Sequence, residues 1–309
     1  MEAGCGSGSS APSTPTSAPA ASTATGSSTA GGEGGPGSKK PPVTIGTKNF
    51  TEELILGELY AQALRAKGYS VTLKRNIGDS SAVADEMAAG RVSGYPEYTG
   101  TILSVLAKDS RRPTNAAQAY ARAAAYERGK GVRLLAMAPA EDKNALATTP
   151  TYSTSRRVSA LGDLARLGSS VTLAGPSEFR TRFDGLVGMR QVYGITDVGF
   201  RPVEIGKQYA ALRNGRADVI AVFTTDGELS QGGYKLLGDP RQIFGFQNVT
   251  FAVRRDVAQR EGAEFTRTID GVSGKLSTQA LRLMNAAVEL DRQSPAPVAR
   301  QFLAANGLV

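Results

Sequence analysis

The sequence predicts an α/β protein built from two similar halves, each with a largely parallel sheet. Two observations carry this prediction. Short apolar strand patterns alternate with helical patterns from Val43 onward, which is typical of parallel sheets. Similar stretches return in the second half of the chain, and the folded part is longer than one core usually needs.

The first 42 residues contain no Val, Ile, Leu, Phe, Tyr or Trp and are rich in Gly, Ser, Thr, Ala and Pro. Such a segment cannot bury enough apolar surface to offset the entropy of ordering, so residues 1–42 are expected to be a disordered tether. Ala3-Gly4-Cys5 is similar to the end of a bacterial lipobox. We therefore expect Cys5 to be lipidated.

The elements of the first half follow in order. VTIG at 43–46 predicts a buried strand, and Asn49 with Glu52 predicts an N-cap pair that opens a helix ending at Gly68. Residues 70–77 alternate like a strand. Ser80 or Ser81 is expected to cap a helix that Gly90 ends, and a strand through Tyr98 follows.

The second half repeats this order. Residues 171–179 parallel 43–50, and residues 214–226 parallel 89–101, so that Tyr98 corresponds to Phe223. A Gly-Arg-small sequence is also a common junction between helix and strand, so this match alone is weak evidence for a repeat. The match of an aromatic residue followed by threonine is stronger evidence for it. Ligands bind at the carboxyl ends of parallel strands, so Tyr98 and Phe223 are expected to face each other across a cleft.

Composition excludes several function classes. The chain has no histidine and one cysteine, and its Gly-Lys pairs are not followed by Ser or Thr. Histidine-based nucleophiles, common zinc sites and a Walker A loop are therefore excluded, and we expect no cofactor, no metal site and no enzyme. The net charge is +8, but the basic residues are scattered along the chain, so no nucleic-acid partner is expected. The sequence has no run of 18 apolar residues, the length needed to span a membrane.

The stretches VTIGTKNFTEELILGELYAQAL, NIGDSSAVADEMAAG, YPEYTGT, GPSEFRTRFDGL, QVYG, ADVIAVFTTD and QFLAANGLV resemble the substrate-binding proteins of osmoprotectant ABC importers, the glycine betaine/choline/proline-betaine type. The resemblance runs from about Val43 to Val309. It implies the two-lobed periplasmic-binding-protein fold of type II, with a ligand cleft between the lobes. Lobe I would comprise 43–140 and 245–309, lobe II 141–244, with a two-segment hinge near Pro139 and Phe244.

In this family, a box of tyrosines holds a quaternary ammonium, while a lysine, an arginine and a threonine hold its carboxylate. Carried over by position, the resemblance implies the ligand-binding residues Lys48, Thr101, Arg182, Tyr98, Phe223, Phe246 and Asn144. Asn144 stands where the family has a box tyrosine. It replaces a π face by an amide, so a more polar, hydroxylated or phenolic ligand is the alternative to glycine betaine or choline. Asp142 and Gln247 are further candidates for ligand contact.

The resemblance implies a monomeric extracytoplasmic receptor that delivers a small osmolyte to a permease with its ATPase, and that touches the membrane only through a lipid anchor. Two alternatives stay open. A fused receptor domain that senses the solute rather than transporting it would have the same fold. An enzyme that uses Glu97 or Asp226 with Lys48 would need a carboxylate-lysine arrangement for which the sequence has no recognisable motif.

Overall fold

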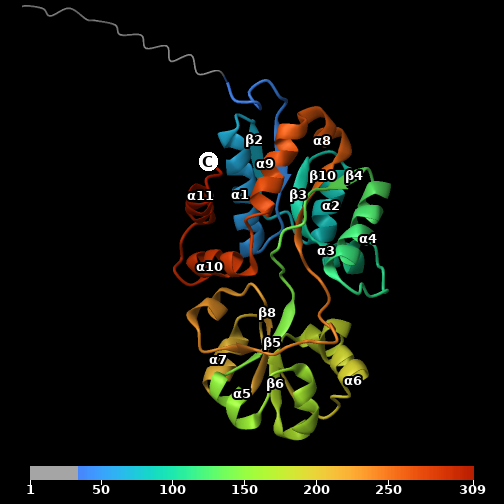
Figure 1. Ribbon diagram of the computed structural model, residues 1–309, viewed down its shortest axis with the longest axis vertical. Helices are drawn as coiled ribbons and strands as arrows, with labels where there is room; N and C mark the ends of the chain where they lie inside the picture. Colours follow the sequence, from blue (N-terminus) through green and yellow to red (C-terminus); the bar gives the residue numbers. More distant parts are fainter. Residues whose placement is uncertain (1–33) are drawn as a thin grey trace, which may run out of the picture. The chain divides into compact units, whose positions relative to one another are not determined.

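A computed structural model describes residues 34–309 and contains two five-stranded sheets. The first sheet has the order β2-β1-β3-β10-β4 and the second β7-β6-β8-β5-β9 (Figure 1). The strands of the first sheet are β1 (Val43–Gly46), β2 (Val71–Lys74), β3 (Gly94–Tyr98), β4 (Val132–Leu134) and β10 (Val249–Arg254). Those of the second are β5 (Asn144–Thr148), β6 (Thr172–Gly175), β7 (Gly199–Pro202), β8 (Val219–Phe223) and β9 (Lys235–Leu236).

The two sheets have the same topology. In the first, β1 lies between β2 and β3 and is parallel to both, and β10 runs antiparallel to β3. In the second, β6 lies between β7 and β8 and is parallel to both, and β5 runs antiparallel to β8. Strands β3 and β8 end at Tyr98 and Phe223, the two residues that the repeat pairs, so the repeat predicted from the sequence is confirmed.

Two segments connect the sheets, and they pair with each other. One leads from β4 to β5, and the other leads from β9 to β10. Glu141 and Asn248 form an antiparallel bridge, and the amide of Asp142 donates to the carbonyl of Gln247 across 3.0 Å. Because both segments are held together at this point, any change in the angle between the sheets acts on Asp142 and its neighbours.

Helices cover both faces of the first sheet. One face packs against α1 (Thr51–Ala66), α8 (Arg255–Glu261), α9 (Ala263–Ser273), α10 (Thr278–Glu289) and α11 (Pro295–Ala305). The other packs against α2 (Ser80–Ala88), η1 (Ile102–Leu106), which α3 (Thr99–Thr101) precedes, and α4 (Ala116–Gly129). Tyr95 is buried in this second core.

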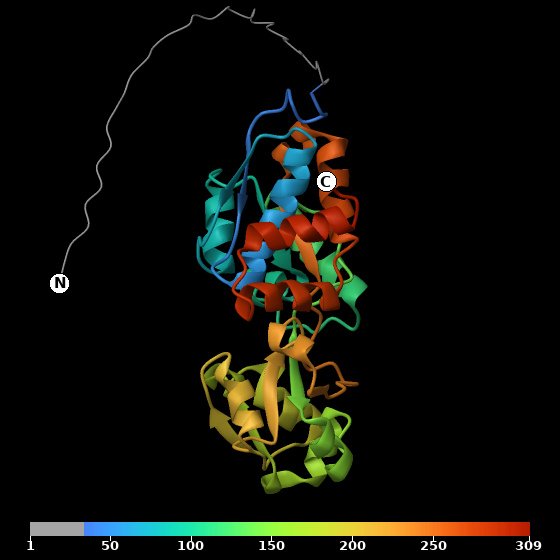
Figure 2. The same cartoon turned by 90° about the vertical axis from the view of Figure 1, so that its left-hand side faces the viewer.

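The second sheet is covered by shorter helices. They are α5 (Pro150–Arg156), η2 (Leu161–Arg166), η3 (Gly168–Ser170), η4 (Ser177–Arg180), η5 (Phe183–Val187), α6 (Gly188–Tyr193), α7 (Lys207–Arg213) and η6 (Gly227–Gln231). Figure 2 shows α10 of the C-terminal part beside η6. A Cβ built on Gly227 would lie 2.7 Å from the backbone nitrogen of Ala286, so only glycine allows this close approach.

The structure corrects two helix caps. The N-cap of α1 is Phe50 rather than Asn49, and no side chain caps it, because a phenylalanine ring has no acceptor. Glu52 accepts from the Tyr98 hydroxyl instead of capping the helix. The N-cap of α2 is Asp79 rather than Ser80 or Ser81, since the Asp79 carboxylate accepts from the amide of Ala82. An Asp reaches the same orphan amides as a serine, one residue earlier.

The described chain begins inside the predicted tether. A turn runs from Gly37 to Lys40, and the amide of Gly37 donates to the carbonyl of Lys67 across 2.9 Å, which orders residues after position 33. Cys5 lies outside the described residues. From residue 34 to residue 309, we find no helix with the length and apolar character needed to cross a membrane.

Candidate functional site: a cleft between the two sheets

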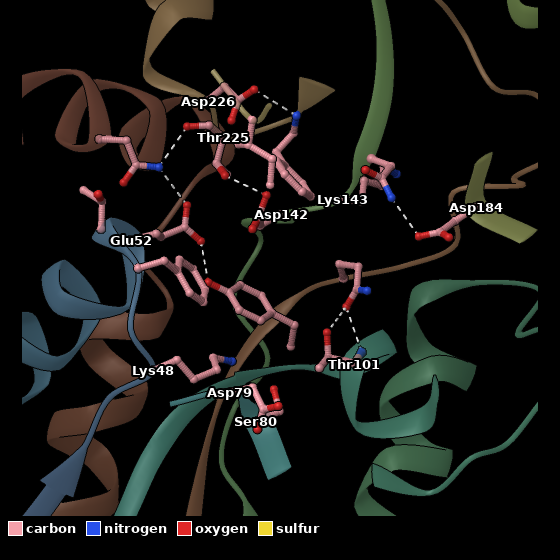
Figure 3. Close-up of a pocket in the computed structure, with 18 of the residues that line it drawn as sticks. Lys48, Glu52, Asp79, Ser80, Thr101, Asp142, Lys143, Asp184, Thr225 and Asp226 are labelled. Atoms are coloured by element: carbon pink, nitrogen blue, oxygen red, sulfur yellow. Dashed lines mark hydrogen bonds between the residues drawn. The ribbon is translucent and has the colours of Figure 1, made fainter. Parts of the chain in front are cut away.

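A cavity of about 600 Å³ lies between the two sheets, where β1, β3 and β8 end (Figure 3). Residues from both halves line it. The first half contributes the segment Lys48–Glu52, Asp79, Ser80, Tyr98 and Thr101, and the connecting segments contribute Asp142, Lys143, Phe244 and Gln247. The second half contributes Asn144, Arg182, Asp184, Ile205, Phe223, Thr225 and Asp226, and α10 contributes Asn285 and Glu289. The cleft predicted at the carboxyl ends of the strands is therefore present.

Glu52 is the centre of a hydrogen-bond network in this cavity. The hydroxyl of Tyr98 donates to its Oε1 across 2.7 Å, and the amide of Asn285 donates to its Oε2 across 2.9 Å. The same Asn285 amide group donates to the carbonyl of Thr225 at 2.9 Å, and the Thr225 hydroxyl donates to Asp142 at 2.8 Å. Asn285 thus connects α1 of the first half to the loop that follows β8.

Burial changes the acidity of these groups. It raises the pKa of the Glu52 carboxyl, although the hydrogen bonds from Tyr98 and Asn285 oppose this effect. Burial raises the pKa of Asp142 well above its ordinary value, and the nearby charge of Glu52 adds to the rise. The pKa of Tyr98 is also raised, first by burial and then by the charge of Glu52. Tyr98 is therefore a neutral hydrogen-bond donor at physiological pH.

Lys48, which the resemblance implies as a ligand for a carboxylate, is already ion-paired. Its Nζ contacts Glu97 and lies 3.3 Å from Oε1 of Glu53. Burial alone would lower the pKa of Lys48, but the charges of Glu53 and Glu97 outweigh it and the pKa is raised. Burial raises the pKa of Glu53 to about 8. Lys48 is thus a fixed cation whose charge the neighbouring carboxylates compensate.

Four aromatic side chains line the cavity: Phe50, Tyr98, Phe223 and Phe244. Tyr98 and Phe50 stack with ring centroids 6.4 Å apart, and Nζ of Lys48 lies 4.3 Å from the centroid of Tyr98. Phe246 is not among the lining residues. Its side chain packs instead against the core on the α2 and α4 side of the first sheet.

The remaining predicted residues lie at the opposite wall or at the rim. Asn144 and Phe223 are direct neighbours on β5 and β8, and the Asn144 amide donates to Asp184 across 2.7 Å. The backbone amide of Thr101 donates to the Gln247 side chain at 2.9 Å. Arg182 lines the cavity and is exposed, and we find no ion pair for it within residues 34–309.

The cavity lining is acidic in sum. Within the described part of the chain it contains six carboxylates and three cationic side chains. Of the three cations, Lys48 is paired with Glu53 and Glu97, and Lys143 is paired with Glu141. The same residues contain no cluster of three groups that could hold a metal ion. The electrostatics favour a ligand that carries a positive charge.

Sequence reasoning missed Phe50, Glu52, Phe244 and Asn285 as cavity residues. Phe50 follows Lys48 in the loop after a strand, where a large aromatic residue is a usable signal of a ligand site. In the structure, 40% of Phe50 is exposed. Glu52 was assigned to helix capping, and its true partners lie far away in the sequence. No local pattern identifies Asn285 on α10.

Comparison with known proteins identifies the family. Residues 41–305 match the family described as the substrate binding domain of the ABC-type glycine betaine transport system. The chain is 32% identical to a glycine-betaine-binding protein of Pseudomonas aeruginosa over 276 residues, which cover 86% of this chain and 88% of the relative. It is 25% identical to the glycine betaine-binding protein YehZ of Escherichia coli, covering 86% of this chain and 91% of that protein.

A solved structure titled a glycine betaine/carnitine/choline ABC transporter superimposes with a TM-score of 0.80 at 23% identity, covering 86% of this chain and 99% of the other. This likeness confirms the predicted two-lobed binding-protein fold. The family match confirms the prediction of a transport protein rather than an enzyme. The chain belongs to the family of substrate-binding domains of ABC-type glycine betaine transport systems.

Proposed function

We propose that this ABC-importer substrate-binding protein takes up a quaternary-ammonium compatible solute, such as glycine betaine or choline, in the cleft. The single observation that carries the proposal is that Tyr98 and Phe223, from equivalent strands of the two sheets, line one acidic cavity. The names of the relatives from Pseudomonas aeruginosa and Escherichia coli support the same ligand class.

The proposal has a direct physical basis. A trimethylammonium group has no N–H to donate, so it is stabilised by aromatic faces and by negative charge rather than by hydrogen bonds. Each aromatic face contributes roughly 0.5–2 kcal/mol, depending on desolvation. Phe50, Tyr98, Phe223 and Phe244 offer such faces, and Glu52 and Asp142 supply negative charge beside them.

A zwitterionic ligand also needs a partner for its carboxylate. Arg182 is the cationic side chain of the lining for which we find no ion pair within residues 34–309. A guanidinium can bind a carboxylate through two parallel hydrogen bonds. We therefore assign the carboxylate of a betaine to Arg182, with Thr101 and Lys48 as further contacts.

The polar pair Asn144–Asp184 supports a second candidate ligand. It lies beside Phe223 at the position of a family tyrosine, so it could hydrogen-bond a hydroxylated or phenolic solute. Asn144→Tyr should then strengthen glycine betaine binding and weaken the hydroxylated ligand. An unchanged order of affinities in that variant would contradict the second candidate.

As part of an ABC importer, the protein works outside the cytoplasm and passes its small-molecule ligand to a permease. We further propose that it acts as a monomer and is held at the membrane by a lipid on Cys5. The Ala3-Gly4-Cys5 sequence before a Ser/Gly/Pro-rich stretch supports this anchor. In a bacterial host, Cys5→Ser should move the protein from the membrane fraction to the soluble fraction, and unchanged fractionation would contradict the anchor.

A thermal-shift panel tests the ligand class. Glycine betaine, choline and carnitine should raise the Tm of the full chain in a concentration-dependent manner, because a ligand that binds only the folded state stabilises it. Proline and glutamate, which lack the trimethylammonium group, should have no effect. Equal shifts with the control amino acids, or none with any quaternary ammonium, would contradict the proposal.

A further inference from the structure

Glu52 and Asp142 are two of the cleft carboxyl groups for which we find no ion pair within residues 34–309. Glu52 is buried at the start of α1, and Asp142 is partly buried in the segment that leads to β5. Figure 3 shows Glu52, Thr225 and Asp142 around the same part of the cavity. The Thr225 hydroxyl donates to Asp142, and Asn285 links Glu52 to the carbonyl of Thr225. The two carboxyl groups therefore belong to one network.

The other charged and titratable groups around this pair do not neutralise it. Lys48 is the cation that lowers the pKa of both carboxyls, but it is ion-paired with Glu53 and Glu97. The groups that face the pair from the surrounding elements are Lys48 after β1, Glu53 on α1, Tyr98 on β3, Asp226 after β8, and Asn285 and Glu289 on α10. The carboxyl groups among them supply no compensating positive charge.

Two carboxyl groups joined through Thr225 and Asn285 in one network, in a site of restricted hydration, resist simultaneous ionisation. Their repulsion can be relieved in two ways, by a proton or by a cation. A quaternary ammonium in the cleft supplies the cation. When it is absent, only the proton is available.

We propose that the Glu52–Asp142 pair holds a proton in the ligand-free protein and that the cationic group of the ligand displaces it. The carboxyl O–H bond breaks, the proton passes to bulk water, and the ionised pair then faces the ligand cation. The inference rests on the proposed function, because it requires a ligand that carries a positive charge. It identifies Glu52 and Asp142 as the residues that bind this charge.

The proposal has a consequence for transport. Ligand affinity should increase with pH over the range in which the pair holds its proton, by up to about tenfold per pH unit where one full proton is released. In acidic surroundings the proton competes with the ligand. The direction follows from burial, which raises the pKa of both carboxyls, and from the charge of Glu52, which adds to the rise in the pKa of Asp142.

The direct test is calorimetry of the full chain with choline and with glycine betaine, in phosphate and in Tris at the same pH, from roughly pH 5 to pH 8. The two buffers differ in ionisation enthalpy, so a released proton makes the observed heat depend on the buffer. We expect a buffer-dependent heat and an affinity that rises with pH. Equal heats in both buffers, with an affinity independent of pH, would overturn the inference.

Variants locate the proton. Glu52→Gln keeps an acceptor oxygen for Tyr98 but loses the one that accepts from Asn285, and Asp142→Asn keeps an acceptor oxygen for Thr225. Each variant removes one of the two titratable groups at little steric cost. Each should reduce the buffer dependence by at least half. Asp197→Asn, which neutralises an exposed carboxylate outside the cavity, should retain the proton release of the unmodified protein. Full proton release in both Glu52→Gln and Asp142→Asn would also overturn the inference.

The outcomes separate this inference from the proposed function. Heat of binding without any buffer dependence contradicts the proton displacement and leaves the ligand class intact. No heat with either ligand, in either buffer and at any pH, contradicts the proposed function itself. The wild-type experiment does not depend on whether a variant folds.

Discussion

The hydroxyl of Tyr98 donates to Oε1 of Glu52 across 2.7 Å. This hydrogen bond connects the aromatic residue that the sequence identifies at the cleft to a carboxylate on the first turn of α1. It orients the Tyr98 ring beside Lys48 and Phe50 and leaves the negative charge of Glu52 at the cavity. Aromatic surface and negative charge are therefore offered to a ligand from the same wall.

Two substitutions of Tyr98 separate these contributions. Tyr98→Phe removes a hydrogen bond to a buried carboxyl and should lower the free energy of unfolding by about 1–2 kcal/mol while it keeps the π face. Tyr98→Ala removes the face and should weaken choline binding by at least about tenfold. Denaturant unfolding and calorimetry measure the two effects. If Tyr98→Phe lost as much affinity as Tyr98→Ala, the aromatic face would not be the decisive contact.

Phe244 and Phe246 provide a matched pair on one connecting segment. Phe244 lines the cavity and Phe246 does not, so Phe244→Ala should weaken the binding of glycine betaine by about tenfold. Phe246→Ala removes a side chain packed against the first-sheet core and should lower stability while Kd stays within about threefold. Kd is measured by calorimetry below the unfolding temperature of each variant. The reverse order of the two affinities would restore Phe246 as the box residue.

Arg182 should discriminate between zwitterions and simple cations. Arg182→Ala removes the proposed partner of a ligand carboxylate, so glycine betaine should bind about tenfold more weakly while choline binding changes little. Arg180→Ala is the control, because Arg180 lies over the Phe200 ring and does not line the cavity. An equal loss for both ligands would argue against a carboxylate contact.

Glu127 on α4 should make the protein less stable at high pH. Burial, with a smaller effect from the charge of Glu97, raises the pKa of Glu127 from 4.5 to about 7, so the folded state binds a proton more tightly than the unfolded state. Its contribution to stability is present below pH 4.5 and is lost as the pH rises through 7. Glu127→Gln should therefore increase the free energy of unfolding at pH 8 by up to about 3 kcal/mol.

Glu86 is the control for that experiment, because its pKa is shifted in the opposite direction to that of Glu127. Hydrogen bonds from Arg91 and Lys74 lower its pKa to about 2, so its contribution is present above pH 4.5 and is lost as the pH falls toward 2. Glu86→Gln should thus destabilise the protein at neutral pH. Urea unfolding between roughly pH 3 and pH 8 measures both variants, and a pH-independent difference for Glu127→Gln would contradict its raised pKa.

Local sequence patterns account for much of the fold. The strands β1, β6 and β8 coincide with apolar runs, and the repeat that pairs Tyr98 with Phe223 predicts two sheets of one topology, as the structure has them. Helix caps were less predictable. Asn49, Ser80 and Ser81 are good capping residues, but tertiary contacts of Glu52 and the nearby Asp79 carboxylate decide where α1 and α2 begin.

The cavity was predictable where the strands end and unpredictable elsewhere. Lys48, Thr101, Asn144, Arg182, Tyr98 and Phe223 all line it. Phe244 lines the cavity and Phe246 does not, because the connecting segment is irregular and no periodicity fixes which side chain faces the cavity. The bond between Asn285 and Glu52 joins residues 233 positions apart, and such a contact leaves no trace in local sequence.

The most direct test of the account is calorimetric titration of the full chain with glycine betaine and choline, alongside a Tyr98→Ala/Phe223→Ala double variant. The account predicts one-to-one binding by the unmodified protein and a loss of at least about a hundredfold in affinity in the double variant, since two aromatic faces are removed. Unchanged binding of both solutes by a folded double variant would contradict the central claim that Tyr98 and Phe223 hold one cationic ligand between the two sheets.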